Sequence, residues 1–220
     1  MSPDLSARLG AFDCCALSDA LDSLGLKGAV TGLAATLPAT RIHGRVHTVQ
    51  LAAGKPPAGA PVRHLCAAAI DACTAGEVIV VEQRTGIEAG SWGGILSRGA
   101  RMKGVAGVIA EGLVRDVDEA REIGFPIFCR GFTALTARAR VHEAATDVPI
   151  RVGDVTVEPG FYVVADSSAT IFISPADAER VLAAVTSIAA RETEIIRRLE
   201  AGETASAALG ANYEHMLQRD

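Results

Sequence analysis

The sequence predicts an α/β protein with a central, at least partly parallel sheet and a long C-terminal helix. Between residues 65 and 131, helical patterns alternate with short apolar strand patterns, which is typical of α/β layers. After residue 174, apolar residues recur at helical spacing. The 220 residues are 49% hydrophobic, 21% charged and only 4% aromatic. We therefore expect a folded globular protein with a core of Ala, Val, Ile and Leu.

The first half of the chain contains both helix and strand patterns. In order, the elements predicted here are a helix at 15–25, a strand at 45–51, a surface loop at 52–61, a helix at 65–73 and a buried strand at 77–83. The first helix has apolar residues at 17, 20, 21 and 24, with Gly25 as its stop. The last strand has a continuous β-branched, apolar centre at 78–81, as strands buried on both faces do.

The second half repeats this alternation. The elements predicted here are a helix at 92–104, a strand at 105–110, a turn at 111–116, a short helix at 116–124, a strand at 126–131 and several short strands over 150–174. The closing helix is expected to have Ser174 as its N-cap, Pro175 in its first turn and Gly202 at its end. Its apolar stripe consists of Val181, Val185, Ile188, Ile195 and Leu199.

Charge and hydropathy exclude several classes of function. The formal net charge of −5 gives no electrostatic footprint for nucleic acid or for an anionic membrane surface. The longest apolar runs, such as 105–110, are far shorter than a membrane helix, and the N-terminus has no basic region followed by an apolar stretch. We therefore expect a cytoplasmic protein without nucleic-acid or membrane partners.

The five cysteines and the histidines give no strong metal motif. The cysteines stand at positions 14, 15, 66, 73 and 129 and form no CxxC pair, so they are interpreted as reduced thiols packed as small hydrophobes. His43 and His47 lie four residues apart but lack an obvious third ligand. They are interpreted as ordinary polar positions.

A glycine-rich segment, AGSWGGILSRGA (89–100), is the first candidate site. A small-residue loop that opens a helix presents unpaired backbone N–H groups to an anion. The same glycines also suit tight packing of the helix on the sheet. The segment alone does not choose between these two interpretations.

A second candidate site is the segment EGLVRD (111–116), which follows a buried strand. Ligands bind at strand ends in α/β sheets, where Arg115 could grip a carboxylate and Asp116 could hold a hard cation. Alternatively, Asp116 caps the next helix and Glu119 completes a capping box. Spacing alone favours the cap.

Taken together, these segments resemble the RraA-like family. The run WGGILSRGARMKGVAGVIAEGLVRDVDEAREIGFPIFCRG (92–131) is similar to its signature, with further matches at 17–25 and 155–182. The family contains class II 4-hydroxy-4-methyl-2-oxoglutarate aldolases, which also decarboxylate oxaloacetate, and RraA regulators of ribonuclease E. The resemblance implies one domain over residues 1–220, a swivelling β/β/α sandwich with a C-terminal helix. It also implies homotrimers or hexamers with sites between subunits.

The resemblance also implies roles for particular residues. Asp116 would bind Mg²⁺ or Mn²⁺, Arg115 would bind the pyruvoyl part of a 2-oxo acid, and both would be catalytic. The substrate carboxylate would be held by backbone amides at Gly93, Gly94, Ile95 and Leu96. A neighbouring subunit would lend an acid from the C-terminal helix, with Glu194 the first choice and Glu192 the second.

Three departures from the family pattern concern the same site. Gly94 stands where the aldolases usually carry an acid, Glu111 replaces an aspartate, and Phe161, Ser168 and Ala169 interrupt a later motif. Glu111 is a candidate catalytic replacement for the missing acid. We predict a metal-dependent lyase that releases pyruvate from a small 2-oxo acid. The alternatives are a non-catalytic ring protein that regulates a partner, or a diverged enzyme that isomerises or hydrates an oxo acid.

Overall fold

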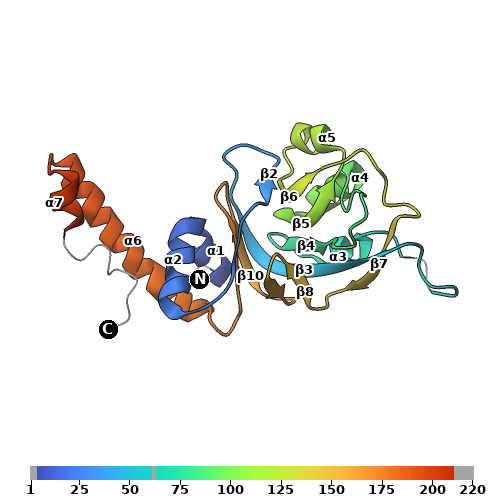
Figure 1. Cartoon of the computed structure of the whole chain (residues 1–220), viewed down its shortest axis with the longest axis horizontal. Helices are drawn as coiled ribbons and strands as arrows, with labels where there is room; N and C mark the ends of the chain where they lie inside the picture. The colour runs from blue at the N-terminus through green and yellow to red at the C-terminus, as the bar shows by residue number, and fades with distance from the viewer. Residues whose placement is uncertain (1–3, 61–62, 211–220) are drawn as a thin grey trace.

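A curled nine-stranded sheet forms the centre of the computed structural model, which describes residues 4–60 and 63–210 (Figure 1). Residue 61, at the end of the predicted 52–61 loop, lies outside the described residues. The strands are β1 (Ala29–Val30), β2 (Ala34–Ala35), β3 (Ile42–Ala53), β4 (Val78–Glu82), β5 (Gly107–Val114), β6 (Ile127–Phe132), β7 (Val141–Thr146), β8 (Ile150–Val152), β9 (Val155–Val157), β10 (Tyr162–Ala165) and β11 (Thr170–Ile173). The helices are α1 (Leu5–Gly10), α2 (Cys14–Leu24), α3 (Ala67–Ala72), α4 (Gly94–Lys103), α5 (Val117–Glu122), α6 (Ala178–Glu200) and α7 (Ala205–Leu209).

The middle of the sheet is parallel and its flanks are antiparallel. Strands β3, β4, β5 and β6 pair in parallel, in that order. Strand β3 continues the sheet on its other side by pairing antiparallel with β10 and with β7, the latter with a register shift between Gln50 and Leu51. Strands β8 and β9 form a separate hairpin. All the carboxyl ends of the parallel strands therefore meet at one edge of the sheet, and all their amino ends meet at the opposite edge.

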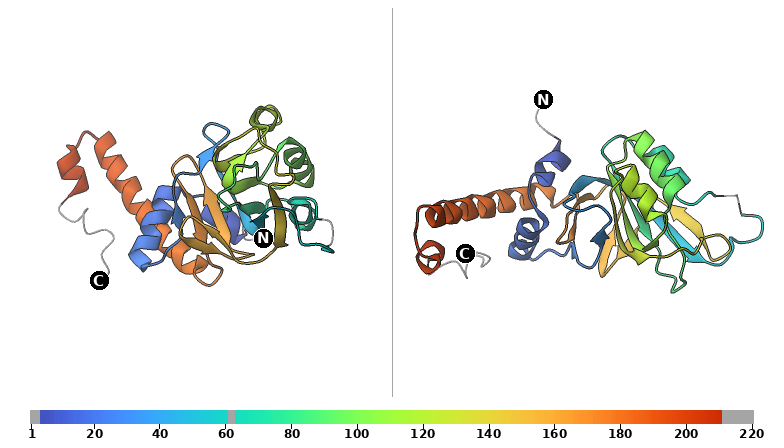
Figure 2. Two further views of the ribbon diagram at one scale, coloured as in Figure 1. Left: turned by 45° about the vertical axis from the view of Figure 1, so that its right-hand side comes forward. Right: turned by 90° about the horizontal axis from the view of Figure 1, so that it is seen from above.

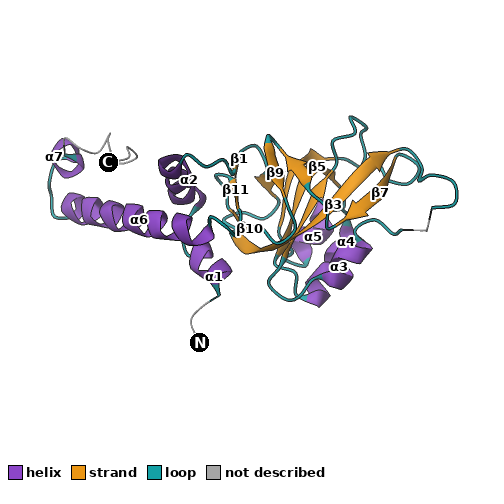
Figure 3. Ribbon diagram, turned by 90° about the horizontal axis from the view of Figure 1, so that it is seen from below, coloured by secondary structure: helices purple, strands orange, loops and turns teal. Residues whose placement is uncertain are grey.

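Helices cover two separate parts of this sheet (Figure 3). Helices α3, α4 and α5 pack on the parallel strands, around the buried side chains of Trp92, Phe125 and Ile127. Helices α1, α2 and α6 pack on β10 and β11. A third cluster, which includes Phe128 and Phe172, fills the space between the parallel strands, the β8–β9 hairpin and β10–β11. Helices packed against a partly parallel sheet agree with the predicted α/β class.

Most predicted elements are confirmed to within a few residues, and two are wrong in a way that matters. The predicted turn at 111–116 is strand as far as Val114, because β5 continues its pairing with β6 after a register shift between Ala110 and Leu113. The C-terminal helix begins at Ala178 with Asp177 as its N-cap. Ser174 instead closes a preceding turn, where its hydroxyl accepts from the Asp177 N–H at 3.2 Å.

Helix α6 has two dissimilar halves (Figure 2). Val181, Val185 and Ile188 are buried against the body of the protein. Farther along the predicted stripe, Ile195 is half-buried and Leu199 is 40% exposed, so the stripe is fully buried over its first half only. Ile196, next to the stripe, is 54% exposed. Among the described helices, none combines the length and apolar character needed to cross a membrane.

Candidate active site

The Arg115–Asp116 pair lies at the carboxyl end of β5, where the chain turns into α5. Asp116 has left-handed backbone geometry (φ 55°), an unusual conformation for a residue other than glycine and one that Asp tolerates better than most. This turn directs its carboxylate toward the start of α4, where Oδ2 accepts the Gly94 N–H at 3.0 Å. The Arg115 Nε donates to both carboxylate oxygens, at 3.3 and 3.2 Å. The end of β5, the start of α4 and the Arg115–Asp116 ion pair therefore lie in contact with one another.

The predicted capping box is wrong. The Asp116 side chain makes no capping hydrogen bond to α5, because the left-handed turn carries it away from that helix. It acts instead on the neighbouring helix α4, whose positive end favours a carboxylate. The Glu119 carboxylate is bound by the Arg98 Nε of α4, so it too faces the neighbouring helix.

The glycines of the 89–100 segment make room for these side chains. A Cβ at Gly90 would lie 2.9 Å from the Arg115 Cγ, and one at Gly93 would lie 2.9 Å from the Asp116 Oδ2. A Cβ at Gly94 would coincide with the Glu119 carboxylate. The glycines therefore serve the charged groups of the site as well as the packing of α4. The space left by Gly94 is filled by Glu119.

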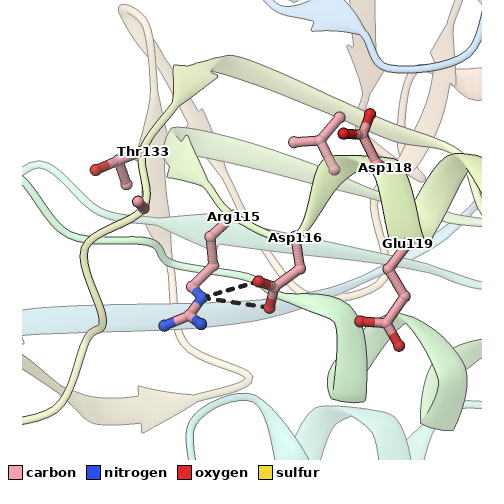
Figure 4. A pocket seen from close by; sticks show the side chains of 7 residues that line it. Arg115, Asp116, Asp118, Glu119 and Thr133 are labelled. Atoms are coloured by element: carbon pink, nitrogen blue, oxygen red, sulfur yellow. Dashed lines mark hydrogen bonds and ion pairs between the residues drawn. The ribbon is translucent and has the colours of Figure 1, made fainter.

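An open cavity of about 470 Å³ lies beside this cluster (Figure 4). It is lined by Arg115, Asp116, Val117, Asp118, Glu119, Thr133 and Ala134. The terminal nitrogens of Arg115 lie on the side of its guanidinium away from Asp116 (Figure 4). The Asp118 side chain is 96% exposed and pairs with Arg121. The Arg115 and Asp116 side chains are each 36% exposed, so a small anion and water can reach both.

A rigid support lies under the start of α4. The indole of Trp92 is buried, stacks on Phe125 and donates from Nε1 to the Ser97 Oγ at 2.9 Å. Ser97 in turn donates to the Gly93 carbonyl at 3.1 Å. The Arg115 N–H donates to the Trp92 carbonyl at 3.0 Å, which ties the end of β5 to the same loop. These bonds fix the glycine segment against the Arg115–Asp116 turn.

Glu111, the predicted replacement for the missing acid, belongs to another cluster. Its carboxylate accepts from Nε and Nη2 of Arg130 at 3.0 and 2.8 Å. Arg130 also donates to the Thr31 carbonyl at 2.7 Å. Glu111 is not among the residues that line the cavity.

The two candidate acids of α6 lie at the other end of the molecule from α4 and α5 (Figures 1 and 2). Glu194 accepts two hydrogen bonds from Arg197, which lower the pKa of its carboxyl group. Burial, together with the nearby charges of Asp13 and Asp19, raises the pKa of Glu192. Within one chain, neither side chain joins the Asp116 cluster, so their predicted role depends on a neighbouring subunit.

Sequence reasoning missed the contribution of Glu119 and of the segment after β6. The sequence pattern predicts only a capping role for Glu119, although the absence of a side chain at Gly94 is a signal that another group fills that space. Thr133 and Ala134 reach the cavity because β6 runs parallel to β5 and ends at the same edge. No motif marks them in the sequence.

Comparison with known proteins identifies the family. The family model for RraA-like proteins, described as Aldolase/RraA, matches residues 14–172, and the chain belongs to this family. Protein DlpA of Legionella pneumophila is 27% identical over 202 residues, which are 92% of this chain and 32% of DlpA. The chain thus spans about a third of the length of that relative.

Two further relatives carry an enzyme name. A 4-hydroxy-4-methyl-2-oxoglutarate aldolase of Thermus thermophilus is 37% identical over 103 residues, which are 45% of this chain and 60% of the aldolase. A protein of Halalkalibacterium halodurans, given the same enzyme name provisionally, is 30% identical over 170 residues, 76% of this chain and 74% of its own length. Family membership is therefore accompanied by relatives named as lyases.

Solved structures confirm the fold. An uncharacterized protein from Pseudomonas syringae superposes with a TM-score of 0.82 at 29% identity, covering 94% of this chain and 96% of that one. RraAS2 of Streptomyces coelicolor, an unusual member of the RNase ES inhibitor RraA protein family, gives a TM-score of 0.75 at 26% identity, covering 90% and 98%. The predicted RraA-like α/β fold with a C-terminal helix is confirmed.

Proposed function

We propose that the protein is a divalent-metal-dependent carbon–carbon lyase that releases pyruvate from a small 2-oxo acid. The reaction is retro-aldol cleavage of a 4-hydroxy-2-oxo acid, decarboxylation of oxaloacetate, or both. The observation that carries this proposal is the Arg115–Asp116 pair at the end of β5, set against the first turn of α4 beside an open cavity. The enzyme names of the relatives support the reaction class.

The substrate is held by positive charge and by backbone amides. The terminal nitrogens of Arg115 bind the pyruvoyl part of the substrate, to which a planar guanidinium can donate two parallel hydrogen bonds. The carboxylate lies at the start of α4, held by amides from Gly93, Gly94, Ile95 and Leu96. First-turn amides have no acceptor within their own helix, and the helix end carries partial positive charge. In the structure the Gly94 N–H donates to the carboxylate of Asp116, which supports an anion-binding role for this amide.

The donor set at the cavity fits Mg²⁺ or Mn²⁺. Asp116 and Glu119 offer carboxylate oxygens, and the exposure of both side chains leaves room for water, which Mg²⁺ retains in most protein sites. Asp116 would hold the cation, and Glu119 would hold a water beside it. Such a cation supplies Lewis-acid stabilisation of the oxygen on which negative charge develops.

The residues of the chain then account for cleavage. Breaking the carbon–carbon bond beside a 2-oxo group leaves an electron pair that spreads onto the oxo oxygen as an enolate. The fixed charge of Arg115 stabilises that oxygen without reorganisation. The Glu119 carboxylate, through a water, takes the proton of the 4-hydroxyl group in the retro-aldol reaction. In this reaction it then returns that proton to the terminal carbon of the enolate, which yields pyruvate. In the decarboxylation, carbon dioxide leaves and the enolate takes its proton from solvent.

A neighbouring subunit completes the site in this proposal. The chain assembles as a homotrimer or hexamer, and α6 lends Glu194, or alternatively Glu192, to the Asp116 of its neighbour. The uncovered second half of α6, with Ile196 and Leu199 exposed beside Glu194, supports this role. Light scattering should give three or six times the 22.7 kDa mass of one chain. A monomer at micromolar concentration would contradict the shared site.

The alternative is a non-catalytic protein that regulates a partner. The likeness to RraAS2 favours it, since that structure is described as belonging to an RNase inhibitor family. The deciding experiment is a pyruvate-release screen over oxaloacetate and a series of 4-hydroxy-2-oxo acids, with Mg²⁺ or Mn²⁺. We expect release that stops when a chelator is added. A folded oligomer that releases no pyruvate from any member of the series would favour the regulator.

A further inference from the structure

Four side chains converge at the edge of the sheet opposite to Asp116. His47 lies on β3, Cys73 follows α3, Glu77 precedes β4 and Asp147 follows β7. The ligand atoms of His47, Cys73 and Glu77 all lie within 4.8 Å of one another. The proposed lyase site uses none of these residues.

Both ring nitrogens of His47 face carboxylates, from opposite sides of the ring. Nδ1 lies 3.0 Å from the Asp147 Oδ1, and Nε2 lies 3.2 Å from the Glu77 Oε2. If Nδ1 carries the proton and donates it to Asp147, the lone pair of Nε2 faces the group formed by Cys73 and Glu77. A carboxylate behind a histidine in this way fixes the ring and raises the basicity of the ligating nitrogen.

We propose that His47 Nε2, Cys73 Sγ and a Glu77 carboxylate oxygen form a binding site for a thiophilic divalent cation such as Zn²⁺, with Asp147 orienting the histidine. Around a tetrahedral Zn²⁺, bond lengths of about 2.0 Å to N or O and 2.3 Å to S place ligand atoms roughly 3.3–3.6 Å apart. The His47 Nε2 and the Glu77 Oε2 are already 3.2 Å apart, and no pair in the group exceeds 4.8 Å, so the atoms must approach by at most about 1.3 Å to reach this spacing. Three protein ligands leave the fourth position for water.

Charge and access also fit such an ion. The side chains of His47 and Glu77 are 20% and 23% exposed, whereas Cys73 is 1% exposed, so the ion enters from solvent and meets the thiol on the inner side. Lys103, at the end of α4, is near enough to influence the thiol. The positive charges of a divalent ion and of Lys103 together balance the negative charges of a Cys73 thiolate and of the Glu77 and Asp147 carboxylates.

Binding releases the thiol proton to solvent. Burial, with the nearby charges of Glu77 and Asp147, raises the pKa of the Cys73 thiol to about 12, so the thiol is protonated at neutral pH without an ion. A thiolate ligand therefore forms only as the metal–sulfur bond replaces the S–H bond. A ligand set of one nitrogen, one sulfur and one oxygen atom favours ions with high affinity for sulfur and disfavours Mg²⁺.

The test uses Co²⁺ as a spectroscopic probe on the chelator-treated full-length protein. A cysteine-ligated Co²⁺ gives a thiolate-to-metal charge-transfer band in the near ultraviolet, which an oxygen-only site such as that of Asp116 lacks. We expect one equivalent of Co²⁺ to produce this band in the wild type. Asp147→Asn should weaken Co²⁺ affinity about 10–100-fold.

Matched variants make the outcome decisive. Cys15→Ser removes the exposed cysteine, and Asp116→Asn alters the lyase site; both should keep the band. Cys73→Ser should abolish it. His47→Gln, at a less buried position, should abolish the rise in unfolding temperature that Zn²⁺ gives the wild type. No band in the wild type, or a band that survives Cys73→Ser, would overturn the proposal. If Cys73→Ser does not fold, a Zn²⁺ shift that survives His47→Gln would overturn it.

Discussion

The two edges of the parallel sheet carry sites of opposite character. At the carboxyl ends of the strands, Asp116 and Glu119 are partly exposed, and each is paired with an arginine beside an open cavity. At the amino ends, His47 and Glu77 surround a thiol that is almost completely buried. The first set is suited to a weakly held, hydrated cation and an anionic substrate. The second is suited to an ion held tightly through sulfur.

The difference shows how local backbone geometry decides which chemistry an edge can support. The carboxyl-end site depends on a left-handed turn at Asp116 and on three glycines that leave space for charged side chains. The amino-end cluster depends on segments that meet only through the pairing of β3 with β4 and β7. One site is therefore readable from a continuous motif, whereas the other appears only in the folded chain.

The largest expected effect comes from Glu119→Gln, compared with Glu111→Gln. A positioned acid–base group contributes about 10²–10⁴-fold, so Glu119→Gln should lower kcat for pyruvate release by at least about 10²-fold. Glu111→Gln disturbs the pair with Arg130 outside the cavity and should cost less. Steady-state kinetics on a 4-hydroxy-2-oxo acid, whose cleavage requires removal of the 4-hydroxyl proton, measure both variants. A larger loss of kcat in Glu111→Gln than in Glu119→Gln would indicate that Glu111, and not Glu119, is the second acid of the site.

A comparable loss is expected from Gly94→Ala, because the new Cβ would displace the Glu119 carboxylate. Stability should change by less than about 1 kcal/mol, since the end of the Glu119 side chain can move and Ala is a better helix former than Gly. The losses in Gly94→Ala and Glu119→Gln should not add when the two are combined. Additive losses would show that Gly94→Ala does not act through Glu119.

Arg115→Lys should reduce kcat/KM by about 10–100-fold, mainly through a higher KM. Lysine keeps the charge but cannot donate two parallel hydrogen bonds to the oxygens of the pyruvoyl part, as arginine can. Arg121→Lys provides the matched control, because Arg121 pairs with the exposed Asp118 at the rim of the same cavity. Equal kinetics for the two variants would remove Arg115 from substrate binding.

The smallest effect concerns the stability of the amino-end cluster. Burial alone would raise the pKa of Glu77, but the Thr74 N–H and His47 together bring it below its ordinary value of 4.5. Its contribution to stability is therefore present above pH 4.5 and is lost as the pH falls through the folded-state pKa. In the metal-free protein, Glu77→Gln should cost at most about 1 kcal/mol at neutral pH and less near pH 3. Urea unfolding at both pH values measures this difference; a cost that grows in acid would contradict it.

The sequence was sufficient for the fold class and for the Arg115–Asp116 motif, because alternating apolar segments and a continuous motif are local signals. It was insufficient where the same side chain could interact with either of two neighbouring elements. Asp116 and Glu119 have the spacing of a capping box, yet both interact with α4, since the left-handed turn at Asp116 is not encoded by spacing. His47 lacked a third ligand in sequence because Cys73 and Glu77 reach it only through strand pairing.

The central claim is that Asp116 binds the catalytic cation, and one paired measurement tests it directly. Asp116→Asn can keep the left-handed turn and an oxygen to accept the Gly94 N–H, but it loses the charge; Asp118→Asn makes the same change at a solvent-directed position of the same cavity. Pyruvate release is followed for both as Mg²⁺ is increased. We predict a fall of at least about 10²-fold for Asp116→Asn, only partly restored by excess Mg²⁺, and near wild-type release for Asp118→Asn. Equal, Mg²⁺-saturable release from both variants would contradict the claim.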